Sequence, residues 1–191
     1  MKKLTLVVLV LAVPASGWAQ VATPELERQQ NLDRAHSAVQ KTGLATLAIA
    51  GTLGLIQFAN KPTLFGDGLC STGEAIGGDF ACGGGMSILH FVFAASTLGL
   101  FVAEQVIAAE MNPSPYRTGD LNKDRATDHL RWVNAGLFIA QPVLGLIAAH
   151  PALIGIPTDA RPMFSRVMRT VHFGVGLGLA TTYTVNAALM W

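Results

Sequence analysis

The sequence predicts an all-α integral membrane protein: an up-down-up-down bundle of four helices preceded by a signal peptide. Of its 191 residues, 51% are hydrophobic and 13% are charged, which is typical of a small membrane protein and not of a soluble domain. Four apolar segments are long enough to cross a bilayer, at about residues 36–59, 86–109, 130–150 and 170–191. Stretches rich in glycine, proline or charge separate them and predict loops.

Residues 1–19 have the pattern of a secretory signal peptide. Lys2 and Lys3 precede an apolar run, and small residues near Ala19 suit cleavage after that position. We therefore expect residues 20–191 to form the transmembrane domain, in a bacterial inner membrane, with an uncleaved anchor as the alternative. A signal peptide places the start of the first span outside, whereas the lysines and arginines of the loops favour the opposite orientation.

The third span is the most regular segment. From His129 to His150 the chain is almost wholly apolar, and twenty-one steps of about 1.5 Å carry it roughly 31 Å, the thickness of the hydrocarbon core. Positions 129, 136, 143 and 150 are seven apart, which predicts one inward stripe in a packed bundle. Gly136 on that stripe leaves room for a broad group.

Three loops are predicted, at residues 60–85, 112–128 and 151–169. Cys70 and Cys82 in the first loop either form one bridge or remain free thiols. Residues 120–124 in the second begin like a calcium-binding loop, but Arg125 stands where that loop needs glycine, so a solvated loop is preferred.

Each span begins near a histidine, which suggests a prosthetic group. In an alternating bundle, the first and third spans start on one side and the second and fourth on the other. The predicted pairs are therefore His36 with His129 and His90 with His172, and each pair suits the axial ligation of one b-type haem. Gly43 and Gly136, each seven residues after a histidine, give room for the macrocycle. A single haem, or interfacial histidines without a cofactor, are the alternatives.

Further polar residues fall near these pairs. Glu104 and Asn186 each follow a histidine by fourteen residues, at the level of His36 and His129. A carboxylate there could orient an imidazole or take up a proton, or simply be an interfacial acid. His150 is a candidate ligand or hydrogen-bond partner on the other side. Arg169 is either a partner for a haem propionate or a membrane anchor.

This arrangement of histidines resembles the cytochrome b561 family over residues 34–191. The resemblance implies a four-helix core in which the first and third helices hold one haem and the second and fourth hold the other. It also implies electron transfer between the haems and a redox partner protein or a quinone. The chain lacks the flanking helices of that family and any substrate-site signature, so it indicates neither donor nor acceptor.

Other classes of function find less support. A net charge of +1 gives no basic surface for nucleic acid, and the sequence contains neither a phosphate-binding glycine loop nor a Ser-His-Asp pattern. We predict a dihaem electron-transfer protein, not a stand-alone enzyme, surrounded by lipid. Two rivals stay open: a cofactor-free structural or assembly subunit of a larger membrane complex, and a protein that handles copper or zinc through its histidines.

Overall fold

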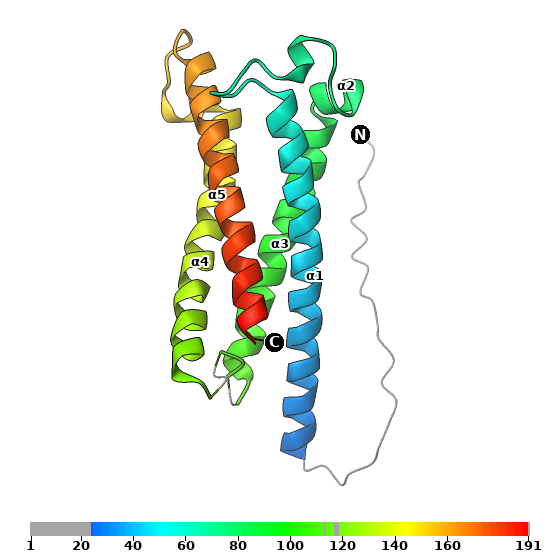
Figure 1. The fold of residues 1–191 in the computed structure, drawn as a ribbon, viewed down its shortest axis with the longest axis vertical. Coiled ribbons are helices and arrows are strands. Elements are labelled where there is room, and N and C mark those ends of the chain that lie inside the picture. The colour runs from blue at the N-terminus through cyan, green and yellow to red at the C-terminus, as the bar shows by residue number, and fades with distance from the viewer. Residues whose placement is uncertain (1–23, 113, 117–118, 191) are drawn as a thin grey trace.

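The computed structural model describes residues 24–112, 114–116 and 119–190, and helices dominate these ranges (Figure 1). Five α-helices are present: α1 (Pro24–Asn60), α2 (Gly78–Cys82), α3 (Gly85–Glu110), α4 (Leu121–Ala149) and α5 (Arg161–Met190). Two short 3-10 turns lie at Leu69–Ser71 and Pro151–Ile154. The predicted signal peptide, residues 1–19, lies outside the described residues.

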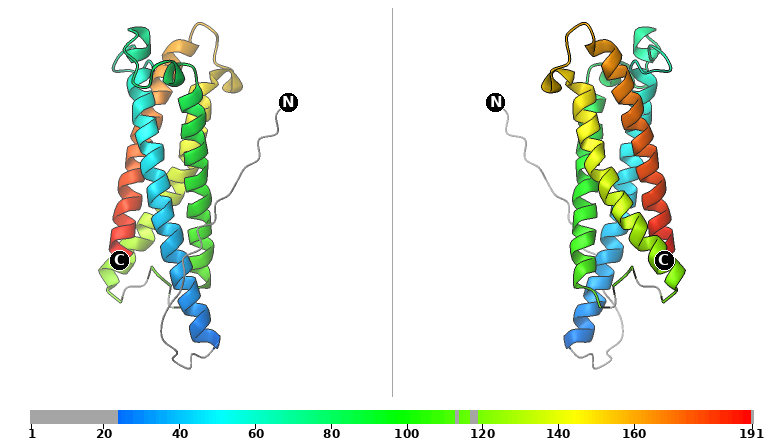
Figure 2. Two further views of the ribbon diagram at one scale, coloured as in Figure 1. Left: turned by 90° about the vertical axis from the view of Figure 1, so that its right-hand side faces the viewer. Right: turned by 90° about the vertical axis from the view of Figure 1, so that its left-hand side faces the viewer.

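Four of these helices, α1, α3, α4 and α5, are long and apolar enough to cross a membrane. The predicted all-helical fold, with four helices that could each span a membrane, is thereby confirmed. The helices run alternately up and down, and they form two close pairs, α1 with α3 and α4 with α5 (Figures 1 and 2). A smaller contact between α1 and α5 joins the pairs.

Two of the helices begin earlier than the sequence predicts. Residues 121–128, expected in a loop, form the first turns of α4, because the Asp120 carboxylate accepts hydrogen bonds from the backbone N–H groups of Asn122 and Lys123. The feature that resembles a calcium loop is therefore a helix cap. Residues 161–169 likewise belong to α5. Pro162 is tolerated there since the first amides of a helix need no intrahelical partner.

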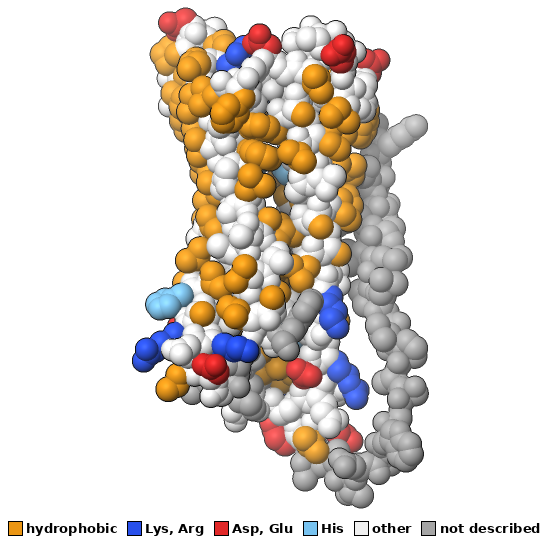
Figure 3. Space-filling view, in the orientation of Figure 1, with side chains coloured by type: hydrophobic (Ala, Val, Ile, Leu, Met, Phe, Trp, Pro, Cys, Tyr) orange, Lys and Arg blue, Asp and Glu red, His pale blue; other side chains and the backbone are white. Residues whose placement is uncertain are grey.

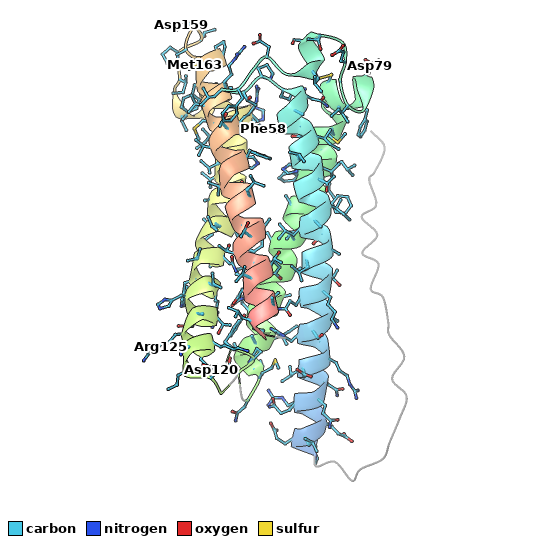
Figure 4. All side chains as sticks on the ribbon, viewed as in Figure 1. Phe58, Asp79, Asp120, Arg125, Asp159 and Met163 are labelled. Atoms are coloured by element: carbon cyan, nitrogen blue, oxygen red, sulfur yellow. A yellow bond between two sulfur atoms is a disulfide. The ribbon has the colours of Figure 1, made fainter. Side chains whose placement is uncertain are left out.

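The loop between α1 and α3 closes one end of the bundle. Cys70 and Cys82 form a disulfide within it, and the Lys61 ammonium donates to the Cys82 carbonyl. We call this side, with residues 61–84 and 150–160, the disulfide end. The opposite side, with the start of α1 and residues 111, 112, 114–116, 119 and 120, is the Tyr116 end. Figure 4 shows Asp79 and Asp159 at the former and Asp120 and Arg125 at the latter.

The bundle exposes large apolar side chains on its outer surface and buries several polar ones inside. Figure 3 shows a hydrophobic middle zone, with charged side chains gathered at the two ends. Large apolar residues of all four long helices are exposed on it, among them Leu55, Phe91, Ile139 and Leu177. The buried residues include His36, Gln40, Thr97, Glu104, Thr127, Asn134, Ser165 and Asn186. This distribution is the one that a surrounding lipid solvent favours.

The facing of α4 differs from the prediction. His129, Gly136, Val143 and His150, expected on an inward stripe, are all exposed. The inward stripe lies two residues earlier, at Thr127, Asn134, Gln141 and Ala148. Both stripes repeat every seven residues, but the second carries polar side chains in the middle of the span, Asn134 and Gln141, where the first has Gly136 and Val143. In lipid, burial of polar groups between helices decides which stripe faces inward.

Candidate functional site

His90 on α3 and His172 on α5 face each other across the two helix pairs. Their ring centroids are 6.1 Å apart and their planes meet at 84°. Both side chains are half-buried. Because the two histidines come from different pairs, a group bound between them would hold the halves of the bundle together.

The two histidines have matching surroundings. The His90 ring lies on Gly54 of α1, where an added Cβ would be 3.2 Å from the ring, and the His172 ring lies on Gly145 of α4 at the same distance. The His90 Nδ1 is 2.9 Å from the carbonyl oxygen of Ala50, four residues before Gly54. The backbone of Gln141, four residues before Gly145, lies near the His172 ring. The two histidines thus occupy equivalent positions in their respective helix pairs.

The hydrogen bond of His90 fixes its tautomer. A carbonyl oxygen only accepts, so the His90 Nδ1 must carry the proton and donate it to Ala50. The lone pair is then on Nε2, away from α1. An imidazole whose Nδ1–H is held by a backbone carbonyl and whose Nε2 is free is the usual form of a metal ligand.

The geometry of this pair fits axial ligation of one metal. With metal–nitrogen bonds of about 2.0–2.1 Å, two imidazoles on opposite sides of a metal have ring centres about 6 Å apart. A zinc site in a protein has three or four protein ligands. The described residues bring together no group of three or more His, Cys, Asp and Glu side chains. A two-histidine site with a flat ligand around the metal, as in haem, matches this donor set better.

Polar atoms without partners surround the pair. The Gln57 Nε2 and Gln141 Oε1 are buried, and no atom of the described structure makes a hydrogen bond to them. Buried polar atoms are nearly always satisfied, so these two indicate a missing polar group or water. Figure 3 shows the surface hollowed between α1 and α5 in this half of the bundle, with histidine atoms inside the hollow.

An aromatic pair borders the site toward the disulfide end. Phe58 of α1 and Phe173 of α5 stack with their centroids 4.1 Å apart, and Figure 4 shows Phe58 on the side of α1 that faces α5. These two rings fill the space between α1 and α5 on the disulfide-end side of the histidines. They would form an apolar wall of a ligand site there.

His36 has a different neighbour from the predicted one. It is 5% exposed, and its Nε2 lies 3.8 Å from Oε1 of Glu104 on α3. His129 is exposed on the outer face of α4. The predicted pair of His36 and His129 is therefore not formed, because the register of α4 turns His129 outward.

Glu104 is the centre of a buried polar cluster at the Tyr116 end. It is 1% exposed. Its Oε2 accepts a 2.6 Å hydrogen bond from the Tyr183 hydroxyl, and its Oε1 accepts one from the Gln40 amide at 3.4 Å. The predicted approach of Glu104 to the level of His36 is thus present, with Gln40 and Tyr183 as members that the sequence did not single out.

Gly43 serves this cluster. A Cβ at Gly43 would lie 2.9 Å from the Tyr183 Oη, so the glycine makes room for the bond between Tyr183 and Glu104. Gly136, by contrast, is exposed, and nothing lies within 4 Å of its position for a Cβ. Neither Gly43 nor Gly136 therefore makes room beside His90 and His172. Gly54 and Gly145 do so instead.

A second layer surrounds the cluster. Tyr116 is buried, its ring meets that of His36 edge-on at 6.5 Å, and its hydroxyl accepts from the Gln105 amide. The Arg131 guanidinium lies over the Tyr116 ring and donates to Gln105. Burial, together with the charge of Glu104, raises the pKa of Tyr116 to about 12.

The other predicted residues lie apart from both histidine sites or have other partners. Asn186 is buried, and its Oδ1 has no partner in the described structure. The Arg169 guanidinium donates to the Pro62 carbonyl, and His150 is an exposed residue at the end of α4. Their roles near a cofactor stay predictions.

Aromatic packing separates the cluster from the histidine pair. Phe101 of α3 and Phe138 of α4 stack at 4.4 Å, and the Tyr183 ring meets both edge-on. With Leu179 they form the buried hydrophobic core. The bundle therefore has two polar regions, and an apolar block lies between them.

Comparison with known proteins adds no identification: no family model, no curated protein and no solved structure matches the chain.

Proposed function

We propose that the protein is a b-type membrane cytochrome that holds haem between His90 and His172 and passes electrons to or from a redox partner or a quinone. The observation that carries this proposal is the facing pair of imidazoles between the two helix pairs, 6.1 Å from centroid to centroid. Haem, when bound, supplies reversible one-electron chemistry. The match of His90 and His172 to one of the two histidine pairs of the cytochrome b561 arrangement supports the same function.

Each neighbouring residue has a defined part in this proposal. Ala50 orients His90 through its carbonyl, and Gly54 and Gly145 let the two rings lie close against α1 and α4. Phe58 and Phe173 limit the access of water from the disulfide end. Gln57 and Gln141 are buried donors or acceptors for a polar edge of the ligand.

One haem is the form that we propose. A second haem at His36 and His129 stays a sequence-based prediction. The structure does not favour it, because His36 is buried beside Glu104 whereas His129 is exposed on the outer face of α4.

The visible spectrum of the purified protein, reduced and oxidised, tests the proposal. We expect reducible haem bands that are lost in His90→Ala and in His172→Ala, because a b-type haem is held only through its axial ligands and its packing. His129→Ala and His150→Ala are the matched controls, since both histidines are exposed, and they should keep the full haem content.

A further variant separates lost ligation from misfolding. His172→Gly leaves space for free imidazole, so added imidazole should restore the bands if the fold is intact. Full haem content in both alanine variants would refute the ligand assignment. A purified protein without haem or metal would favour the subunit hypothesis, and a bound metal without haem would favour metal handling.

A further inference from the structure

A cavity of about 430 Å³ lies at the Tyr116 end, next to the cluster around Glu104. Residues of α1, of the segment after α3 and of the end of α5 line it, among them Asp33, His36, Gln40, Asn112 and Ser114. Asp33 and Asn112 are exposed, so the cavity reaches the outside, while His36 and Gln40 are buried. Seven of the ten residues that line it have polar side chains, which suits water.

His36 lies between this cavity and the interior. Its Nε2 is buried and has no hydrogen-bond partner in the described structure, although Glu104 Oε1 is only 3.8 Å away. That separation is too long for a hydrogen bond. A small rotation of either side chain, or one bridging water, would close it.

Glu104 is a carboxyl group that needs compensation for burial. Inside a helical membrane bundle an uncompensated charge is costly, and such groups usually serve ion or proton transfer. Gln40 and Tyr183 donate to its two oxygens, but both are neutral, and the cation that acts on it, the Arg131 guanidinium, is hydrogen-bonded to Gln105. A proton is therefore a ligand that this site is built to hold.

We propose that the cavity, His36 and Glu104 form a proton-uptake site that accompanies reduction of the haem, an inference that rests on the proposed function. The His36 imidazole accepts a proton from a hydronium ion in the cavity, which leaves water, and the imidazolium then carries a proton on each ring nitrogen. Its Nε2 gives a proton to Glu104 Oε1 and the ring returns to the neutral imidazole, while the carboxylate becomes a neutral acid. One proton thus enters for one electron that the haem receives from its reductant.

Charged and titratable groups face the pair from each neighbouring element. They are Asp33 on α1, Arg131 on α4, Tyr116 in the segment after α3 and Tyr183 on α5. Asp33 attracts positive charge toward His36 at the mouth of the cavity. Arg131, which lies over the Tyr116 ring, adds positive charge near Glu104, and the two tyrosines are neutral groups.

The apolar block gives the route a direction. Beyond the Tyr183 hydroxyl, the next side chains are its own ring and those of Phe101, Phe138 and Leu179. These offer no acceptor. The buried polar side chains farther along the helices, Thr97 and Asn134, are already hydrogen-bonded to Thr46 and Thr182, so the route ends at Glu104. Protons then enter from the Tyr116 end alone, and the charge on Glu104 acts on the haem through the low-dielectric interior.

Infrared spectroscopy tests the site without requiring haem. We expect difference spectra of the purified protein between alkaline and acid pH to show the carbonyl band of a buried protonated carboxyl group, shifted in D₂O. Glu104→Gln should abolish this band. Glu110→Gln is the matched control, because Glu110 lies on the same helix but is exposed and paired with Arg28. Tyr183→Phe, which keeps the carboxyl group and removes one donor, should shift the band without abolishing it.

Proton uptake on reduction tests the coupling. A pH indicator in weakly buffered solution should report uptake in the wild type, at least tenfold slower uptake in His36→Gln, and none in Glu104→Gln. His129→Gln, an exposed histidine at the same end, should behave as wild type. A carbonyl band that survives in Glu104→Gln, or equal losses in the control variants, would overturn the proposal.

The two proposals fail separately. A protein that binds no haem but shows the Glu104 band refutes the cytochrome and leaves the proton site standing. A protein that binds haem through His90 and His172 but takes up no proton at Glu104 refutes the proton site alone.

Discussion

The five histidines occupy three kinds of environment, and the environment separates their chemistry. His90 and His172 face each other between the helix pairs, His36 is buried beside a carboxyl group, and His129 and His150 are exposed. An imidazole becomes a metal ligand or a proton carrier only where a second group meets it at the right distance. Only three of the five histidines satisfy that condition.

Gly43 provides a test of the Glu104 cluster through stability. Gly43→Ala would bring a methyl group within 2.9 Å of the Tyr183 Oη, and such overpacking costs about 1–3 kcal/mol. We expect a lower thermal unfolding temperature in detergent. Gly136→Ala is the control: with open space around it, the alanine should be neutral or stabilising by about 0.5–1 kcal/mol through helix propensity. Equal effects in both variants would contradict the close packing at Gly43.

Tyr116 provides a test through pH. Its pKa is raised from 10.0 to about 12, so the fold favours the protonated phenol. The corresponding stability is fully present below about pH 10 and is lost as the pH rises through about 12. The chain has two tyrosines, and the ultraviolet absorbance of phenolate follows their ionisation. We expect Tyr116→Phe to remove the absorbance step near pH 12. If the wild type instead shows a step near pH 10, and Tyr116→Phe removes that step, the burial of Tyr116 is contradicted.

At the scale of the helices, length and hydropathy were enough to locate all four spans. The side of each helix that turns toward the bundle interior was harder to predict, as α4 shows. Two stripes with a seven-residue repeat are possible on this helix. The sequence predicts that the histidine stripe faces inward, because histidines suggest ligand binding. The stripe with Asn134 and Gln141 is the buried one. The rule that polar side chains turn away from lipid would have selected it from the sequence.

The same reasoning explains which site residues the sequence could supply. Glu104 follows His90 by fourteen residues on one helix, so local periodicity placed it. Its contact with His36, and the contacts of Gln40 and Tyr183, join different helices. These depend on the relative rotation and shift of the helices, which no single segment encodes. The positions of Gly54 and Gly145 against the histidine rings depend on the same packing.

At the scale of the whole molecule, two helix pairs enclose two polar regions at different levels. The histidine pair lies toward the disulfide end and the Glu104 cluster toward the Tyr116 end, and the aromatic block separates them. In a membrane this arrangement places the proposed electron and proton sites near opposite faces. The orientation of the bundle therefore decides from which side the proton is drawn.

We expect the Tyr116 end to face the cytoplasm, for two reasons. The Cys70–Cys82 disulfide belongs to the other end, and disulfides persist in oxidising compartments. The cations at the disulfide end are engaged: Lys61, Arg161 and Arg169 donate to backbone carbonyls, and Arg166 pairs with Asp67. Exposed cations at the Tyr116 end include Arg34, Lys41, Lys123 and Arg125, and loops rich in lysine and arginine stay inside. A cleaved signal peptide would impose the opposite orientation.

Labelling with a membrane-impermeant maleimide decides between these orientations. The native cysteines are bonded to each other and do not react, so one added cysteine reports its own side. Asp159 and Arg125 are exposed at opposite ends. In sealed right-side-out vesicles we expect Asp159→Cys to be labelled at once and Arg125→Cys only after permeabilisation, because the disulfide end should face outward. The reverse pattern would establish the signal-peptide orientation, with proton uptake at Glu104 from the outer side.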